Sequence, residues 1–218
     1  MEIITFDELD STNDYLKEFH DKYENFTTIR AIKQKKGRGR FERVWTSKKD
    51  LTFSILFKES FPHHFIAPLT INTVLNNSGF NSVIKWPNDI LIDGVKTCGI
   101  LIEKIFSGKK SVDIVGIGIN VEKRSDFNYL HKYKKIKPAN LLKTIVKLYS
   151  FFCTLPVDEL RDLYITKSTI INKEVEYKNE QYKVVNINLN GELVISNEKE
   201  EKIVNAYEID CTTMIIKK

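Results

Sequence analysis

The sequence reads Lys85-Trp86-Pro87-Asn88-Asp89-Ile90-Leu91 at the junction of two apolar, strand-like runs. Pro87 has no backbone N–H for a sheet ladder, and Asn and Asp favour turns, so this stretch suits neither a helix nor a strand. Polar side chains at such a junction indicate a functional site. Asp89 is able to hold magnesium or orient a lysine, and Lys85 is able to reach a phosphate. The plain alternative is an Asn-Asp turn beside a buried tryptophan.

A second polar cluster lies upstream and reads Gln34-Lys35-Lys36-Gly37-Arg38-Gly39-Arg40-Phe41-Glu42-Arg43-Val44-Trp45. Glycines free the backbone so that its N–H groups converge on an anion. Arginines bring bidentate donors for a carboxylate or a phosphate. The G-K-[ST] end of a Walker loop is missing. A flexible basic loop is the alternative, as is an RNA-binding Gly-Arg segment, although such segments usually repeat and this one does not.

Three shorter features accompany these clusters. Ser11 with Asp14 three residues later is a helix N-terminal capping pattern. Glycines interrupt an apolar run at Gly116-Ile117-Gly118-Ile119-Asn120, and glycine in a strand often marks the close approach of a ligand or another backbone. Lys96 follows Asp93-Gly94, a strong hairpin signal, and a lysine there is by itself more often simply exposed.

The remaining pattern predicts an α/β core followed by a small β unit. Strand-like runs cover 28–34, 51–57, 82–86, 90–93, 99–105 and 112–121, and helical spacing is expected over 65–79, from residue 138 and over 157–164. Short alternating runs then follow at 174–177, 182–187, 193–196 and 202–204, and these predict a small antiparallel barrel. We therefore expect two domains, 1–168 and 169–218.

The composition is that of an ordinary globular protein. Of 218 residues, 42% are hydrophobic and 29% are charged, and the formal charge of +5 is too mild to indicate nucleic-acid binding by itself. Cys98, Cys153 and Cys211 form no C-x-x-C pair, so neither a disulfide framework nor a zinc site is supported. No secretory signal and no run long enough for a membrane span is visible. These features predict a cytoplasmic protein.

Taken in order, these pieces resemble the catalytic domain of the biotin–protein ligase (biotin–[acetyl-CoA-carboxylase] ligase) family. The resemblance is carried by L-D-S-T-N over 9–13, the cluster over 34–45, the strand over 51–57, K-W-P-N-D-I-L-I-D-G-V-K-T-C-G-I-L-I-E over 85–103 and G-I-G-I-N-V over 116–121. The match is strong over residues 1–125. The C-terminal β unit matches the family's SH3-like domain only in its position and in its pattern of short alternating runs. The DNA-binding domain of repressor-type members has no counterpart before these motifs, so no DNA partner is expected.

The resemblance implies a fold, a reaction and partners. The fold is a mixed sheet like that of class II aminoacyl-tRNA synthetases, expected here with helices on one side, followed by an SH3-like barrel. Biotin and ATP, with Mg²⁺, form biotinyl-5′-adenylate and pyrophosphate. The acyl group then passes to a lysine of a biotin carboxyl carrier protein. Family members are often homodimers, which an exposed edge strand is able to mediate, and no membrane is involved.

The resemblance also implies roles for single residues. The implied biotin-binding residues are Ser11, Thr12, Asn13, Gln34, Gly37, Arg38, Gly39, Arg40, Lys96, Gly99, Gly116 and Gly118. The implied nucleotide-binding residues are Arg43, Trp45, Lys85, Asn88 and Asn120. Lys96, Arg40 and Asp89 are implied as catalytic, with Asp89 also a candidate magnesium ligand. The strand glycines are expected to let the backbone approach the ligand.

Two departures and two alternatives accompany this assignment. Glu42 stands where the family loop often has glycine, which puts loop ordering and nucleotide affinity in question. Cys98 stands where a small residue is usual, and we interpret it as a packed, inert side chain. A lipoate or octanoate ligase of the same fold is one alternative function. The other is a non-catalytic biotin- or nucleic-acid-binding module, against which Lys96 and the Trp-Pro-Asn-Asp block argue.

Overall fold

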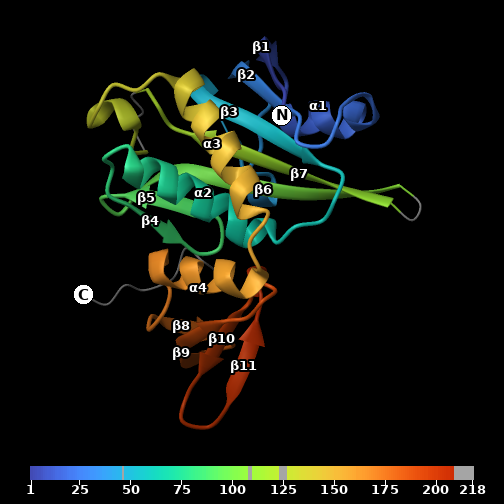
Figure 1. Cartoon of the computed structure of the whole chain (residues 1–218). Coiled ribbons are helices and arrows are strands. Elements are labelled where there is room, and N and C mark those ends of the chain that lie inside the picture. Colours follow the sequence, from blue (N-terminus) through green and yellow to red (C-terminus); the bar gives the residue numbers. More distant parts are fainter. Residues whose placement is uncertain (46, 108–109, 123–126, 209–218) are drawn as a thin grey trace.

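The computed structural model describes residues 1–45, 47–107, 110–122 and 127–208 (Figure 1). Its centre is a seven-stranded sheet in the order β1-β2-β3-β7-β6-β5-β4. The strands are Ile3–Leu9 (β1), Thr28–Gln34 (β2), Ser47–Phe57 (β3), Ser82–Lys85 (β4), Asp89–Ile92 (β5), Val95–Ser107 (β6) and Lys110–Ile119 (β7). β1 and β2 pair in parallel, and the other neighbours pair antiparallel, so the sheet is mixed as predicted.

Helices cover both faces of this sheet, in contrast to the expectation of one. Thr12–Phe19 (α1) lies on one face, and His63–Asn77 (α2) and Pro138–Phe152 (α3) lie on the other. The reason is β3, whose successive side chains point to opposite faces and are apolar on both. Phe53 belongs to the core that packs against α2 and α3, whereas Leu56 packs with Leu16 of α1. A strand with apolar side chains on both faces of the sheet must be packed against other elements on both faces.

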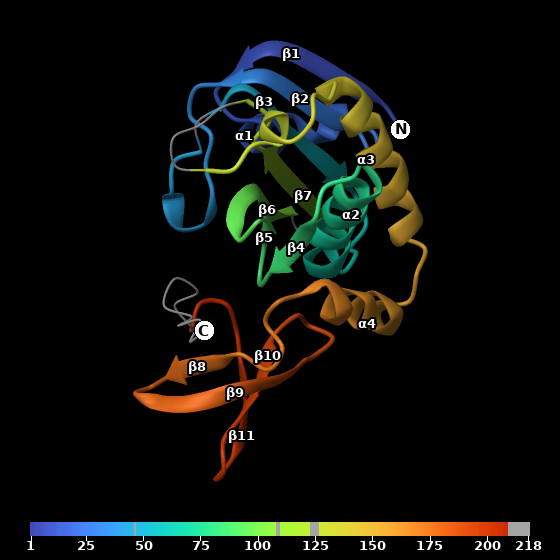
Figure 2. The same cartoon turned by 90° about the vertical axis from the view of Figure 1, so that its left-hand side faces the viewer.

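The C-terminal strands form a separate antiparallel sheet below the main one (Figure 2). A helix, Val157–Lys167 (α4), leads to Glu174–Tyr177 (β8), Glu180–Ile187 (β9), Leu193–Ser196 (β10) and Glu201–Val204 (β11). Tyr164 of α4 and Val184 of β9 belong to one continuous apolar core with the main sheet. The predicted antiparallel unit is thus confirmed, and its described part is a four-stranded sheet. Cys211 lies outside the described residues.

Local signals account for most element ends. Ser11 caps α1 and accepts a hydrogen bond from the backbone N–H of Asp14 at 3.3 Å, as the capping pattern predicts. Asp93 and Gly94 have φ of 52° and 75°, the conformation of the expected tight hairpin between β5 and β6. Strand β1 was not predicted. Among the described residues no helix is long and apolar enough to cross a membrane.

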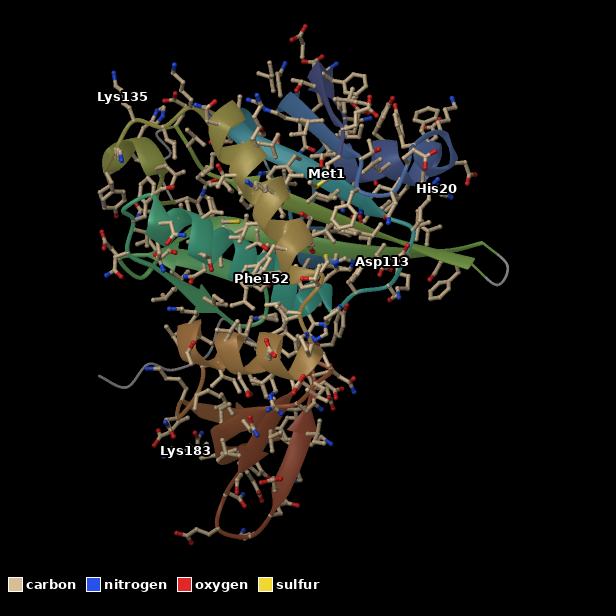
Figure 3. All side chains as sticks on the ribbon, viewed as in Figure 1. Met1, His20, Asp113, Lys135, Phe152 and Lys183 are labelled. Atoms are coloured by element: carbon tan, nitrogen blue, oxygen red, sulfur yellow. The ribbon has the colours of Figure 1, made fainter. Side chains whose placement is uncertain are left out.

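A buried polar cluster joins β6, β7, α2 and α3. His63 Nδ1 lies 2.8 Å from the Tyr149 hydroxyl, and His63 Nε2 lies 3.5 Å from Asp113 Oδ2. Lys104 Nζ lies 3.3 Å from the other oxygen of Asp113. Figure 3 places Asp113 near the point where the β6–β7 hairpin leaves the body of the sheet. Burial lowers the pKa of His63, because it disfavours the imidazolium more than Asp113 stabilises it.

This lowered pKa predicts a loss of stability in mild acid. The ordinary pKa is 6.5, so below that pH the unfolded state takes up the proton before the folded state. The free energy of unfolding should therefore fall as the pH drops from 6.5 towards the folded-state pKa of His63, by at most about 1.4 kcal/mol per pH unit. His64, whose pKa is also lowered by burial, adds a slope of the same sign.

Urea unfolding between pH 8 and pH 5 measures this slope. His63→Gln should reduce the slope and leave only the contribution of His64. Asp113 does not interfere, because its pKa lies below the ordinary 3.8 and its stabilising effect is lost only at lower pH. Equal slopes in the original protein and the His63 variant would contradict the assignment.

Candidate functional site

A cavity of about 630 Å³ lies between the start of α1, the loop 38–45 and strands β6 and β7. The predicted residues that line it are Ser11, Thr12, Asn13, Gln34, Arg38, Gly39, Arg40, Arg43, Trp45, Lys85, Asn88, Asp89, Lys96, Gly99, Gly116 and Gly118. Gly37 and Asn120, which were also predicted, do not line it. Residues from five distant parts of the sequence thus meet in one place.

The glycine-arginine loop is closed into a short hairpin by its own backbone. The N–H of Gly39 donates to the carbonyl of Arg43 at 2.7 Å, and the N–H of Trp45 donates to the carbonyl of Gly37 at 2.8 Å. A Cβ on Gly37 would lie 2.4 Å from the Trp45 carbonyl, so this position requires glycine. Gly37 therefore acts through the shape of the loop and not by lining the cavity.

Glycines of β6 and β7 form a floor on which Trp45 rests. Gly99 and Gly118 are directly opposite each other in the β6–β7 ladder. A Cβ on Gly118 would lie 2.4 Å from the Trp45 indole, and a Cβ on Gly99 would lie 3.0 Å from it. The close approach expected at these glycines is therefore made by a side chain of the protein itself. Lys96 Nζ lies 5.9 Å from the centre of the indole, which places a cation beside it.

The start of α1 is fastened to the sheet by hydrogen bonds. The Thr12 N–H donates to Gln34 Oε1 at 2.7 Å, and the Ser54 hydroxyl donates to Asn13 Oδ1 at 2.5 Å. A Cβ on Gly116 would lie 2.2 Å from Asn13 Oδ1, so this glycine makes room for the amide. Asn13 is 5% exposed and thus has little free surface. Thr12, Asn13 and Gln34 shape the cavity wall as well as facing it.

Arg38 is held by three carboxylates. It makes two hydrogen bonds to Asp14, one of them at 3.4 Å from Nε, and its Nη1 donates to Glu42 at 3.2 Å. Its Nη2 lies 3.7 Å from Glu103, a residue that also accepts from Asn13 Nδ2 at 2.7 Å. Every nitrogen of this guanidinium therefore has an acidic partner, which makes Arg38 an anchor of the loop.

Charge pairing shifts the pKa values of these groups. Partial burial raises the pKa of Asp14, but Arg38 and Lys17 outweigh burial, and the net pKa lies below the usual value. The hydrogen bond to Asp14 raises the pKa of Arg38. Glu42 has φ of 54°, a conformation that favours glycine, and its ion pair with Arg38 opposes that cost. Its carboxylate thus faces Arg38 at the surface.

The Trp-Pro-Asn-Asp block and the predicted lysine meet at the cavity. Lys96 Nζ lies 2.6 Å from Asp89 Oδ1, and Asp89 and Gly99 are opposite each other in the β5–β6 ladder. Asn88 donates to the carbonyl of Ile100 at 2.7 Å, which fixes its amide. Asp89 therefore orients Lys96, one of the two roles that its residue type suggested.

Two further predicted positions are buried. Neither amide atom of Asn120, which is fully buried, has a hydrogen-bond partner within the described part of the chain. Cys98 is also fully buried, and burial raises the pKa of its thiol far above the usual range. Cys98 is thus a packed side chain and not a thiolate nucleophile, as predicted.

Sequence reasoning missed Glu103, Asp14, Ser54 and Tyr207. An isolated glutamate at the end of the apolar run Gly99–Glu103 was the available signal for the first of them. Nothing in the sequence connected Tyr207, which follows β11, with a cavity in the main sheet. Across the described ranges, no three His, Cys, Asp or Glu side chains converge as metal ligands.

Residues 5–120 match the Biotin/lipoate A/B protein ligase family, and the chain belongs to this family. Over 110 residues it is 38% identical to the bifunctional ligase/repressor BirA of Bacillus spizizenii, covering 46% of this chain and 34% of that protein. Over 185 residues it is 30% identical to biotin–protein ligase 2 of Arabidopsis thaliana, covering 77% and 53%. The chain thus spans about a third to a half of the length of these relatives.

Solved structures share the fold over nearly the whole chain. The biotin protein ligase from Aquifex aeolicus in complex with biotin and ATP has a TM-score of 0.81 at 28% identity, covering 96% of this chain and 97% of that one. The biotin acetyl coenzyme A carboxylase synthetase from Helicobacter pylori has a TM-score of 0.72 at 20% identity, covering 93% and 99%, and its likeness is one of fold. The predicted fold class is confirmed.

The glycine floor predicts the effect of a single added methyl group. Gly118→Ala should displace Trp45, shift its fluorescence emission and destabilise the protein by about 1–3 kcal/mol, the usual cost of overpacking. The emission shift should vanish in a Trp45→Phe background, which assigns it to Trp45.

Gly39→Ala is the matched control. Its Cβ would meet only the Arg43 carbonyl at an ordinary 3.6 Å, so the emission should stay unchanged. An unshifted spectrum in Gly118→Ala would show that Trp45 does not rest on this floor.

Proposed function

We propose that the protein is a biotin–protein ligase that activates biotin with ATP and transfers it to a lysine of a biotin carboxyl carrier protein. The observation that carries this proposal is the ion pair between Lys96 and Asp89 in a cavity that also contains Arg40 and Arg43. Family membership and likeness to a ligase in complex with biotin and ATP support it. A protein that only bound a ligand would not need an oriented lysine beside two arginines.

In the first step a biotin carboxylate oxygen attacks the α-phosphorus of ATP, and pyrophosphate leaves with the electron pair of the broken P–O bond. Two anions must be held together against their repulsion, which requires clustered cations. Lys96 binds the carboxylate and stabilises charge on the α-phosphate, while Asp89 keeps its ammonium in place. Arg40, which also lines the cavity, covers the mixed anhydride.

In the second step the neutral amine of the acceptor lysine attacks the acyl carbon, an amide bond forms and AMP leaves. The acceptor lysine reaches this neutral form when its ammonium loses a proton, for which the Asp89 carboxylate beside Lys96 is our candidate acceptor. The adenylate is already activated, so no acyl-enzyme intermediate is needed, in agreement with the buried Cys98.

We assign the nucleotide to Arg43, Trp45, Lys85 and Asn88, which line the cavity, and the biotin ring to the wall formed by the start of α1 and Gln34. Magnesium fits this site as a companion of ATP. Mg²⁺ usually binds one or two carboxylates together with phosphate oxygens and water, and Asp89 offers one carboxylate without a preformed cage. When bound, the ion would neutralise phosphate charge.

The carrier protein and a second copy of this chain have a common candidate docking edge. The N–H of Ile100 donates to the carbonyl of Asn88. Backbone groups of every second residue of β6 therefore point to the side on which β5 lies. The pairing of β5 with β6 ends at Gly99. Among the described residues, no strand pairs with this side of β6 between Gly99 and the end of the strand. Ile102 and Phe106 are 39% and 75% exposed there, which suits strand addition. The net charge of +5 favours an acidic carrier and salt-sensitive association.

A lipoate or octanoate ligase is the second candidate, because the family description includes lipoate. Both reactions need the same cations, so they differ only in the acid that the cavity accepts. We propose a cytoplasmic location, which the unpaired, buried Cys98 thiol fits.

ATP–pyrophosphate exchange on the purified protein tests the proposal, with biotin, lipoate and octanoate as parallel substrates. Exchange with biotin alone is expected. Exchange with lipoate instead would keep the site and change the substrate, and no exchange with any acid would favour a non-catalytic binder.

Lys96→Ala should reduce this exchange by about 10²–10³-fold, the usual effect of removing one charge-stabilising group. The control is Lys183→Ala, a lysine of β9 on the C-terminal sheet (Figure 3) that does not line the cavity. Circular dichroism should show both variants folded. Normal exchange in the Lys96 variant would refute its assigned role.

Arg40→Ala should still form the adenylate but release it early, so that lysines of bystander proteins become biotinylated. The physical reason is the loss of the group that covers the anhydride. Streptavidin blots of a mixture of the carrier and an unrelated protein measure the selectivity, with Arg161→Ala on α4 as the control. Undiminished selectivity for the carrier would exclude this role of Arg40.

A further inference from the structure

A rigid turn, Asn205–Glu208, follows β11 and faces the cavity. The N–H of Tyr207 donates to Asn205 Oδ1 at 2.9 Å, and the N–H of Asn205 donates to Glu208 Oε2 at 2.9 Å. Tyr177 of β8 donates to the other oxygen of Glu208 at 3.2 Å. The turn is therefore built by its own side chains and tied to the C-terminal sheet, so it presents Ala206 and Tyr207 in a fixed position.

This turn contacts the guanidinium of Arg40. Arg40 Nη2 donates to the carbonyl of Ala206 at 3.1 Å, and its guanidinium carbon lies 5.4 Å from the Tyr207 ring centre and 5.0 Å from the Phe41 ring centre. The two rings meet edge to face at 5.8 Å. A guanidinium has five N–H donors. One contacts Ala206 and another contacts Asn88 at 3.4 Å, so three donors have no partner among the described residues and are available to an anion.

The residues of this contact line two neighbouring cavities. A second cavity of about 380 Å³, bordered by α2 and the outer part of β6, shares Arg40, Phe41, Ala206 and Tyr207 with the first. These four residues therefore border both cavities. Tyr207 is 80% exposed and Phe41 is 61% exposed. Large aromatic side chains at the surface are unfavourable, and here their faces contact a cation at the mouth of the site.

We propose that Tyr207 is a positioning residue, through which the C-terminal sheet holds Arg40 over the activated acyl group. The turn supplies a carbonyl and a ring face that orient the guanidinium with its remaining donors towards the main cavity. The inference rests on the proposed function for its reaction, but the contact itself is independent of any reaction. Loss of the ring should loosen the loop 38–45 and increase loss of the intermediate, while activation proceeds.

Limited proteolysis tests the contact without any activity. Trypsin cleaves after arginine, and Arg38, Arg40 and Arg43 lie in the loop. Tyr207→Ala should be cleaved there about twofold to fivefold faster than the original protein, in line with the strength of a surface cation–π contact. Tyr207→Phe keeps the ring and should restore the original rate. Ile203→Ala, on exposed β11, is the matched control and should cleave at the original rate.

A second measurement tests the consequence. With biotin and ATP but no acceptor, Tyr207→Ala should release AMP faster than the original protein by a similar factor, because an unretained adenylate is hydrolysed in solution. The measured quantity is the ratio of AMP release to pyrophosphate exchange, which should rise in Tyr207→Ala and return to the original value in Tyr207→Phe.

The outcomes separate the two proposals. Absence of biotin-dependent exchange in the original protein would overturn the ligase assignment, while faster cleavage of Tyr207→Ala would still support the contact. Equal cleavage rates in Tyr207→Ala and the original protein would overturn the positioning role. Unchanged AMP release in an exchange-competent Tyr207→Ala would overturn its role in retention.

Discussion

The site depends on the pairing of β6 with β7, which places Gly99 opposite Gly118. Without Cβ atoms at this pair, the surface of the sheet is open enough for the Trp45 indole to lie on it, and Gly116 makes similar room for the Asn13 amide. A side chain from the loop and another from α1 therefore reach the sheet directly. The walls of the cavity follow from that contact, and its floor is backbone, which does not change rotamer.

The cations of the site are kept in place by carboxylates. Lys96 is paired with Asp89, and Arg38 is paired with Asp14, Glu42 and Glu103. Clustered positive charges repel one another in the absence of an anionic ligand, and each nearby carboxylate reduces that repulsion. Arg40 differs, because its described polar contacts are an amide oxygen and a carbonyl. Among the described residues no carboxylate neutralises Arg40, whereas three carboxylates hold Arg38 in the loop.

Short-range signals accounted for most of the fold. Alternation predicted β2 with its observed ends, and Asp93-Gly94 predicted the β5–β6 hairpin. Strand β1 was not predicted because it is an edge strand with little burial. Charged residues such as Asp7 and Glu8 therefore interrupt its apolar pattern. The helix arrangement was wrong because the pattern of β3 was assigned to one face, although Leu56 and Phe53 are both fully buried on opposite faces.

The residues of the site were predictable where they lie within motifs and not where two distant segments meet. Arg40 and Lys96 stand in recognisable blocks, but Tyr207 reaches the cavity only because α4 and the C-terminal sheet dock under α2 and β4. Trp86 shows the same dependence, since its indole N–H donates to the carbonyl of Gly191 in the β9–β10 turn at 2.9 Å. The C-terminal sheet thus contacts the site through backbone carbonyls, at Gly191 and at Ala206. Any residue supplies a backbone carbonyl, so sequence patterns do not reveal such a contact. Only the packed structure shows that this sheet helps to form the cavity.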